Sequence, residues 1–255
     1  MEPTVFITFL FGIVFGSFLN VCIYRIPRKI SIFKIGSFCP ECRTPLPWKY
    51  KIPLISFILL RGRCHYCGAT ISPRYPFIEA LTGILTTLAY LKLGWGGAFI
   101  FYLTFAYSLI VLAWIDLEYQ IIPNRILGFM LLAGIVENAL FQVIPFYEAF
   151  LGFIGAGGIM LLVAVLGRAV FRKEAMGMGD VKFAAVAGFY LGGHMIIYAL
   201  FFSFFIAFLA LMLMQFLGRR QRKEYIPLGP FMSIALIVFI FWGSVIVQWY
   251  WRIVL

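Results

Sequence analysis

The chain has 255 residues, of which 63% are apolar and only 12% are charged. A soluble globular domain carries about twice that charged fraction and lacks long apolar runs, so the composition excludes an ordinary soluble protein and indicates a polytopic membrane protein surrounded by lipid. The net charge of +11 would also suit a nucleic-acid-binding protein. Its basic residues, however, gather in the connections between apolar segments, which is a topology signal, and we expect no nucleic-acid partner.

The apolar segments predict an all-α fold with about eight transmembrane helices. A helix needs roughly 20 apolar residues to cross the hydrocarbon core of a bilayer. The segments lie at 4–24, 77–93, 97–115, 125–144, 149–167, 181–193, 196–217 and 230–251. The sixth segment is short and shares Gly192-Gly193-His194 with the seventh, so this boundary is the least sharply defined of the set.

The basic residues predict the orientation of these helices. Of the 21 Lys and Arg residues, 19 fall in alternate connections that would share one side of the membrane. The positive-inside rule then places both termini outside the cytosol and the long connection inside it. We expect three parts: a first transmembrane helix at 1–24, a cytosolic segment at 25–76, and a transmembrane catalytic helix bundle at 77–255.

The cytosolic segment holds four of the five cysteines, in two C-x-x-C knuckles: Cys39, Cys42, Cys64 and Cys67. Thiolates at this spacing can close a tetrahedral zinc site, and a cytosolic location keeps them reduced. Four cysteine ligands leave no open coordination position for catalysis. We therefore expect a structural zinc ion that stabilises a segment too small to build a large core.

Two other features of the first part remain open in the sequence. The stretch 53–60 between the knuckles is apolar but too short to span a membrane, so it could form a strand or an apolar surface resting on the bilayer. Glu79 lies near the start of the second transmembrane segment. We expect it to make a polar contact to the cysteine-containing insert, the alternative being a second functional site.

Small residues gather in the fifth apolar segment, at Gly152, Gly155, Gly157 and Gly158. Their order does not match a nucleotide-binding glycine loop, and no strand precedes them. We expect them to permit close packing against a neighbouring helix.

The only two aspartates of the chain, Asp116 and Asp180, lie at the predicted cytosolic ends of the third and sixth segments. An acid at membrane depth is costly and usually serves chemistry, transport or a specific contact. If the two side chains meet, they cannot both ionise easily, and they would share one proton around a water molecule. From their places at helix ends, we expect Asp180 to be the base-like partner and Asp116 to be protonated.

Asp180 closes the sequence Gly177-Met178-Gly179-Asp180. We interpret Gly177 and Gly179 as an active-site loop, because glycines permit unusual dihedral angles and leave room for a substrate backbone beside the acid. The structural alternative is a glycine-rich turn in which the aspartate caps a helix.

Other intramembrane chemistries are less well supported. The chain has no H-E-x-x-H motif and only two histidines, which disfavours a zinc metalloprotease. It also lacks a G-x-S-x-G nucleophile motif. An ion- or proton-coupled transporter that uses both aspartates is the alternative from another class, but it predicts acids near the bilayer midplane rather than at one edge.

Several motifs occur in an order that resembles the bacterial type IV prepilin peptidases over nearly the full length of the chain. They are Gly16-Ser17-Phe18-Leu19-Asn20-Val21, Arg25-Ile26-Pro27, the two cysteine knuckles, Arg74-Tyr75-Pro76-Phe77-Ile78-Glu79, Asp116 with Ile122-Pro123-Asn124, Gly177-Met178-Gly179-Asp180-Val181-Lys182, and Ile226-Pro227-Leu228-Gly229-Pro230-Phe231.

This resemblance implies an intramembrane aspartyl protease of the G-x-G-D type in the bacterial inner membrane. Such an enzyme removes a short basic leader from type IV prepilins or pseudopilins at the cytosolic face, after a glycine. Asp116 and Asp180 fall on the two catalytic aspartates of the family, and the four cysteines fall on its zinc-binding segment. Many relatives also N-methylate the new terminus with S-adenosylmethionine, although a leader peptidase without this activity is the alternative. Candidates to receive the basic leader are Glu41, Glu118 and Glu224.

Overall fold

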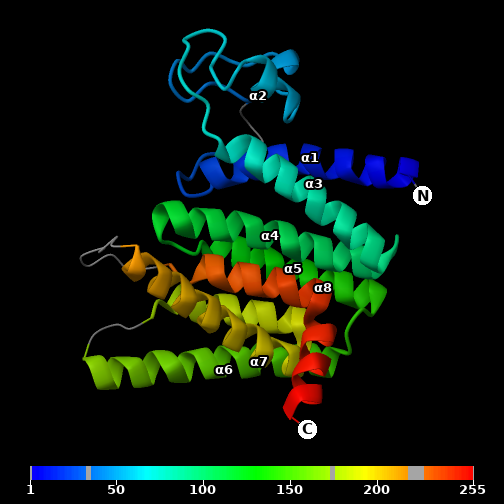
Figure 1. Cartoon of the computed structure of the whole chain (residues 1–255), viewed down its shortest axis with the longest axis vertical. Helices are drawn as coiled ribbons and strands as arrows, with labels where there is room; N and C mark the ends of the chain where they lie inside the picture. Colours follow the sequence, from blue (N-terminus) through cyan, green and yellow to red (C-terminus); the bar gives the residue numbers. More distant parts are fainter. Residues whose placement is uncertain (1, 33–35, 173–175, 218–226, 255) are drawn as a thin grey trace. The chain divides into compact units, whose positions relative to one another are not determined.

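The computed structural model describes residues 2–32, 36–172, 176–217 and 227–254, and all regular secondary structure in these ranges is helical (Figure 1). The chain divides into two compact units, Met1–Trp95 and Gly96–Leu255. Among the described residues, seven helices are long and apolar enough to cross a membrane. The predicted all-α membrane fold is therefore confirmed, while the three-part division by chemistry stays a prediction.

The first unit is built on two long helices, α1 (Glu2–Arg25) and α3 (Arg74–Leu93), with η1 (Trp48–Tyr50) and α2 (Ile55–Leu59) in the segment between them. Gly12 and Gly16 on α1 allow the backbone of α3 to approach closely. A Cβ atom at Gly16 would lie 2.7 Å from the Cα of Glu79, and one at Gly12 would lie 2.7 Å from the Cα of Gly83. Such G-x-x-x-G contacts are a common way to pack helices in a membrane.

Polar side chains fix the end of α1. The Asn20 amide donates a hydrogen bond to the carbonyl of Tyr75 at 3.1 Å. Arg25 is buried, and its guanidinium donates to the carbonyls of Ser31, Ile32 and Gly36 at 2.9–3.1 Å. A buried charge requires such partners, so Arg25 determines the path of the chain as it leaves the helix.

The second unit contains α4 (Gly97–Tyr119), α5 (Asn124–Phe141), α6 (Phe146–Phe171), α7 (Met178–Phe216) and α8 (Gly229–Val254). α7 combines the predicted sixth and seventh helices, and its regular geometry is broken at Gly192, which has φ 75° and ψ 169°. Figure 1 shows that α7 begins and ends on the same side of the unit, so it bends back at this break. With α7 counted as two arms, 178–191 and 193–216, the prediction of about eight crossings is confirmed.

Tyr190 lies at the centre of the second unit and joins three helices. Its fully buried ring stacks on Phe105 of α4 with the centroids 4.1 Å apart. Its hydroxyl donates a hydrogen bond to the carbonyl of Met130 on α5 at 2.7 Å. A Cβ atom at Gly134 would lie 2.8 Å from the Tyr190 ring, so the absence of a side chain there makes room for the tyrosine.

Helices α6 and α7 are in close backbone contact at Gly152 and Gly188. A Cβ atom on either glycine would collide with the carbonyl oxygen of the other. Gly157 also faces α7, with Ala185 at 3.0 Å from its added Cβ, whereas Gly155 and Gly158 face open space. The predicted role of this cluster in helix packing is thus confirmed for Gly152 and Gly157 and is wrong for the other two.

This contact predicts different effects for alanine at contacting and non-contacting glycines of α6 and α7. Gly152→Ala and Gly188→Ala should each destabilise the protein by about 1–3 kcal/mol, because the two backbones must move apart. Gly155→Ala is the matched control, and it should be neutral or stabilising by up to about 1 kcal/mol, because alanine is the better helix former. Thermal unfolding of the three variants in one detergent measures these differences, and equal losses in all three would contradict the close contact.

Candidate functional site: an aspartate pair and a four-cysteine cluster

Asp116 lies in the last turn of α4 and Asp180 in the first turn of α7. Their residues are only 4% and 5% exposed, although both stand close to helix ends. These two helix ends lie on the same side of the second unit (Figure 1). The two carboxyl groups interact electrostatically, so the structure brings together the pair of acids that the sequence singled out.

The connection between α4 and α5 holds the start of α7 near Asp116. The chain leaves α4 through Gln120, which has a left-handed conformation with φ 54°. Ile122 then packs against Gly179, where an added Cβ would lie 3.1 Å from the Cβ of Ile122. Lys182 donates a hydrogen bond to the side chain of Asn124 at 3.3 Å. Residues on both sides of Asp180 are therefore attached to the segment that follows Asp116.

Gly229, the first residue of α8, is a third component of this site; the sequence placed it in a family motif but gave it no role. Its backbone N–H donates a hydrogen bond to Oδ2 of Asp116 at 3.0 Å. An added Cβ at Gly229 would lie 2.5 Å from the same oxygen, so any other residue would crowd the carboxyl group. In the sequence, Gly229-Pro230 indicates the start of a helix, because proline is favoured in the first turn of a helix.

The position of Asp116 at the N-terminus of α8 suits a negatively charged carboxylate. However, the hydrogen bond from the N–H of Gly229 can be accepted either by an ionised carboxylate or by the carbonyl oxygen of a protonated carboxyl group. It therefore does not identify the protonation state of Asp116. The expected assignment of the shared proton to Asp116 therefore stays a prediction.

The explanation of Gly177 and Gly179 by unusual dihedral angles is wrong. Gly177 is extended with φ −72°, and Gly179 is helical and is not among the glycines with positive φ. The close approach of Ile122 gives Gly179 a different role, because a side chain there would press on the α4–α5 connection. The assignment of Gly177 and Gly179 to an active-site loop stays a prediction.

Of the acids considered for the leader, Glu118 is the one that the structure describes in the second unit. Glu118 is exposed and accepts a hydrogen bond from Nε1 of Trp114 at 2.9 Å, so it points away from the face that Asp116 occupies. Glu41 is exposed in the first knuckle, and Glu224 lies outside the described residues.

The four cysteine sulfurs of the first unit gather at one point, with all of them within 4.8 Å of one another. The cysteines are free, and the sulfurs of Cys39 and Cys67 are 3.9 Å apart. A tetrahedral zinc site with Zn–S bonds of about 2.3 Å has sulfur–sulfur edges of about 3.8 Å, so the cluster fits such an ion. Hydrogen bonding by Thr44 lowers the pKa of Cys42 to about 6, whereas burial raises the pKa of Cys39.

The two knuckles have the same local geometry. In each, the first cysteine donates its N–H to a carbonyl five residues later, and its own carbonyl accepts from the residue four later. These bonds are Cys39 to Thr44 at 3.1 Å, Arg43 to Cys39 at 2.9 Å, Cys64 to Ala69 at 2.8 Å, and Gly68 to Cys64 at 3.0 Å. The tight turns direct both sulfurs of each knuckle towards the same point, where the four cysteines could bind a metal ion.

The insert also contacts α3 through Glu79, which is buried. Its Oε2 accepts a hydrogen bond from the backbone N–H of Leu54 at 2.8 Å. The predicted polar contact between Glu79 and the insert is confirmed. The stretch 53–60 contains the helix α2, so the strand alternative is excluded.

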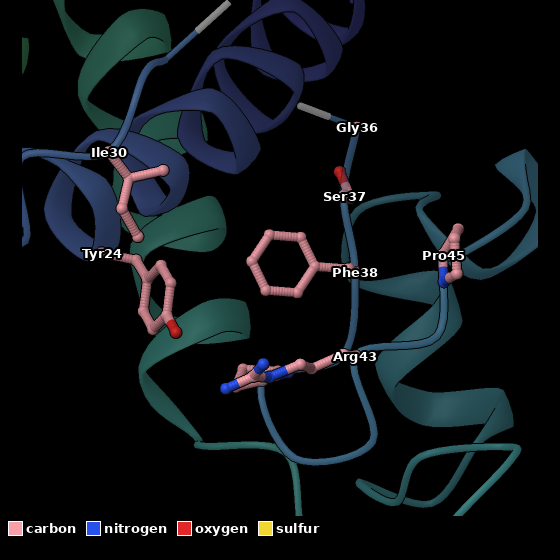
Figure 2. Close-up of a pocket in the computed structure, with 8 residues that line it drawn as sticks. Tyr24, Ile30, Gly36, Ser37, Phe38, Arg43 and Pro45 are labelled. Atoms are coloured by element: carbon pink, nitrogen blue, oxygen red, sulfur yellow. The ribbon is translucent and has the colours of Figure 1, made fainter. Parts of the chain in front are cut away.

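A cavity of about 480 Å³ lies between the end of α1 and the first knuckle. Figure 2 shows Phe38 and Arg43 pointing towards Tyr24 across this space. The other lining residues are Ile30, Gly36, Ser37, Pro40 and Pro45. None of the described lining residues is acidic, and Arg43 carries a positive charge.

Comparison with known proteins agrees with the sequence resemblance. The model of the bacterial peptidase A24 N-terminal domain matches residues 10–93, and that of the type IV leader peptidase family matches residues 103–213. A protein of Legionella pneumophila named prepilin leader peptidase/N-methyltransferase is 32% identical over 94% of this chain and 92% of its own. A protein of the same name from Bacillus subtilis (strain 168) is 34% identical over 98% of both chains. No solved structure gives a significant match.

The contact between Gly229 and Asp116 can be tested by a double-mutant cycle. Gly229→Ala should destabilise the protein by about 1–3 kcal/mol, because the new methyl group crowds Oδ2 of Asp116. In an Asp116→Ala background the same change should cost less, with a coupling of about 0.5–3 kcal/mol. Gly243→Ala, whose nearest neighbour would be the Phe239 side chain of its own helix, is the matched control and should cost the same in both backgrounds. Additive effects for Gly229 would refute the contact.

Proposed function

The chain belongs to the type IV leader peptidase family, and we propose that Asp116 and Asp180 are the two carboxyl groups with which it hydrolyses its substrates. The enzyme is a prepilin leader peptidase that also N-methylates the new terminus of its product. The observation that carries the assignment of the aspartates is their joint burial at one edge of an apolar helix bundle. Structural aspartates at helix ends are normally exposed, and a transport site is expected nearer the midplane.

Two carboxyl groups that share one proton supply both an acid and a base. The ionised member accepts a proton from a water molecule, and the resulting hydroxide attacks the carbonyl carbon of the scissile peptide. The protonated member gives its proton to the carbonyl oxygen, which forms a tetrahedral intermediate. This intermediate collapses when its C–N bond breaks, and the leaving amine takes a proton from the carboxyl group that had accepted one from water. One hydroxyl of the intermediate returns its proton to the other carboxylate as the new carboxyl group forms, so the pair again holds one proton.

We place this chemistry at the cytosolic face of the bacterial inner membrane. Most of the basic residues lie in connections on the side to which Asp116 and Asp180 belong, and the positive-inside rule makes this side cytosolic. A precursor whose apolar helix lies in the membrane and whose basic leader stays in the cytosol presents its junction at this level. Glu41, Glu118 and Glu224 stay candidates to receive the leader, and type IV prepilins or pseudopilins are the substrates.

For the cofactors, we assign zinc to the four cysteines and S-adenosylmethionine as the methyl donor. The sulfur–sulfur spacing supports the zinc ion, which would stabilise the insert without taking part in catalysis. The methyl donor follows from the family alone. No residue of the chain is assigned to it.

Removing either aspartate should abolish cleavage. Asp116→Asn and Asp180→Asn should each lower the rate on a pilin-type precursor by at least about 10²-fold, because each substitution removes the shared proton chemistry. The matched control is Glu137→Gln, which replaces another intramembrane acid whose partner, Thr104, can still donate its hydrogen bond. Mass spectrometry of the product measures cleavage, and thermal unfolding verifies the fold. Full activity in either aspartate variant would remove that residue from the mechanism.

Metal analysis tests the role of the cysteines. The purified protein should contain about one zinc ion per chain, and Cys64→Ser should lose this ion and unfold at a lower temperature. Cys22→Ser is the matched control, because the fifth cysteine is buried in α1 outside the cluster and should leave the zinc content unchanged. A metal-free protein with undiminished thermal stability would refute the zinc site.

A further inference from the structure

The short helix α2 has one packed face and one bare apolar face. Ile55, Ile58 and Leu59 follow the i, i+3, i+4 spacing of one helix face and are 53%, 72% and 74% exposed. On the opposite face, the Ser56 hydroxyl donates to the carbonyl of Lys49 at 3.1 Å. Phe57 packs beneath Gly62, where an added Cβ would lie 3.2 Å from its ring. The inward face thus belongs to the insert, while the outward face contacts no described part of the protein closely enough to cover it.

The bare face continues onto η1, which the Ser56–Lys49 hydrogen bond attaches to α2. Trp48, the first residue of η1, is 77% exposed and is the most exposed tryptophan of the described residues. Together, Trp48, Ile55, Ile58 and Leu59 form what we call the α2 patch. Tryptophan with branched aliphatic residues is typical of surfaces that enter the interface of a bilayer.

Positive charge surrounds the α2 patch. Lys49, Lys51, Arg61 and Arg63 are exposed on either side of it in the sequence, and no acidic residue occurs between positions 42 and 78. An apolar face with a basic rim matches an anionic membrane surface, because the side chains enter the acyl boundary while the charges meet phosphate groups.

A hydrogen bond within the first unit sets the depth of the α2 patch along α3. The N–H of Leu54, immediately before α2, donates to Glu79 at 2.8 Å. Glu79 is five residues past Arg74, the start of α3, which corresponds to about 7.5 Å along the helix axis. Each interfacial layer of a bilayer is about 5–8 Å thick, so α2 is held near the boundary between headgroups and hydrocarbon.

The backbone at Leu54 is strained in the conformation that makes this bond. Leu54 has φ 61° and ψ −50°, and Ile55 donates its N–H to the carbonyl of Pro53 at 2.6 Å. This is a γ-turn of the rare kind with positive φ, which persists only where the surrounding contacts hold it. The Glu79 carboxyl is such a contact, so the attachment of Leu54 to α3 is specified rather than incidental.

We propose that the α2 patch is inserted into the cytosolic interface of the bilayer and binds anionic phospholipid through its basic rim. The insert would then be attached to the membrane at three places, through α1, α3 and α2. The membrane would fix the orientation of the cysteine cluster, independently of the peptidase chemistry.

The depth of Trp48 tests the proposal in the full-length, zinc-loaded protein. The contribution of this residue is the difference between the wild type and Trp48→Phe, measured in vesicles of phosphatidylglycerol and phosphatidylcholine. We expect blue-shifted emission and strong quenching by lipids brominated near the headgroup end of the acyl chain. Emission like that of hydrated tryptophan, unaffected by brominated lipid, would overturn the proposal. Blue-shifted emission without quenching would also overturn it, because protein rather than lipid would then cover the patch.

Charge variants test the lipid preference. Replacing phosphatidylcholine by phosphatidylglycerol should increase the quenching of Trp48, and the double variant Lys51→Gln/Arg61→Gln should reduce this increase severalfold. Lys29→Gln, an exposed basic residue beyond the end of α1, is the matched control and should preserve it. Zinc content verifies that the insert of each variant is intact. An equal response to phosphatidylglycerol in both variants would overturn the assignment to anionic lipid.

Discussion

The burial of two carboxyl groups in an apolar helix bundle is the constraint on which the site depends. Removing a carboxylate from water is costly unless hydrogen-bond donors replace the lost hydration. In the middle of a membrane helix the backbone satisfies its own N–H groups, so no donor is left for a neighbour. Only the first turn of a helix has free N–H groups. Asp116 meets one of these at Gly229, which explains in physical terms why the pair lies at helix ends.

This requirement also accounts for the connections around the pair. The carboxyl of Asp116 can reach the N-terminus of α8 only if nothing stands between them, and Gly229 provides this space. Asp180 in turn requires that α7 begin beside the end of α4. The contact of Gly179 with Ile122 and the hydrogen bond from Lys182 to Asn124 provide that alignment. Three helices that are distant in the sequence therefore converge through contacts of small or polar residues.

Close approach at a glycine occurs at three of the helix contacts described above. Gly16 faces Glu79, Gly152 faces Gly188, and Gly134 faces Tyr190. Lipid is as apolar as a leucine side chain, so helices in a bilayer gain little from burying apolar surface against each other. Van der Waals contact between closely placed backbones replaces this gain, and a single methyl group at such a position removes it.

The sequence predicted features that depend on composition or on residues close together in the chain. Apolar length located the helices, and the glycines at 192 and 193 located the break in α7. The C-x-x-C spacing predicted a cluster because each knuckle is a local turn. Contacts between distant segments were harder to foresee. Nothing in the pattern joins Gly229 to Asp116, which are 113 positions apart, and a stripe of glycines does not show which members face a neighbour. The dihedral explanation of Gly177 and Gly179 failed because a glycine can be required for space alone.

The turn at Leu54 has a consequence for the dynamics of the first unit. Its amide proton is bound by Glu79, a residue of a membrane-spanning helix, while its neighbours belong to the metal-binding insert. A local opening that frees this proton must separate the insert from α3 and release the backbone strain in the same event. Hydrogen exchange at this amide would therefore report the cooperativity between the two parts, and the insert would not behave as an independent folding unit.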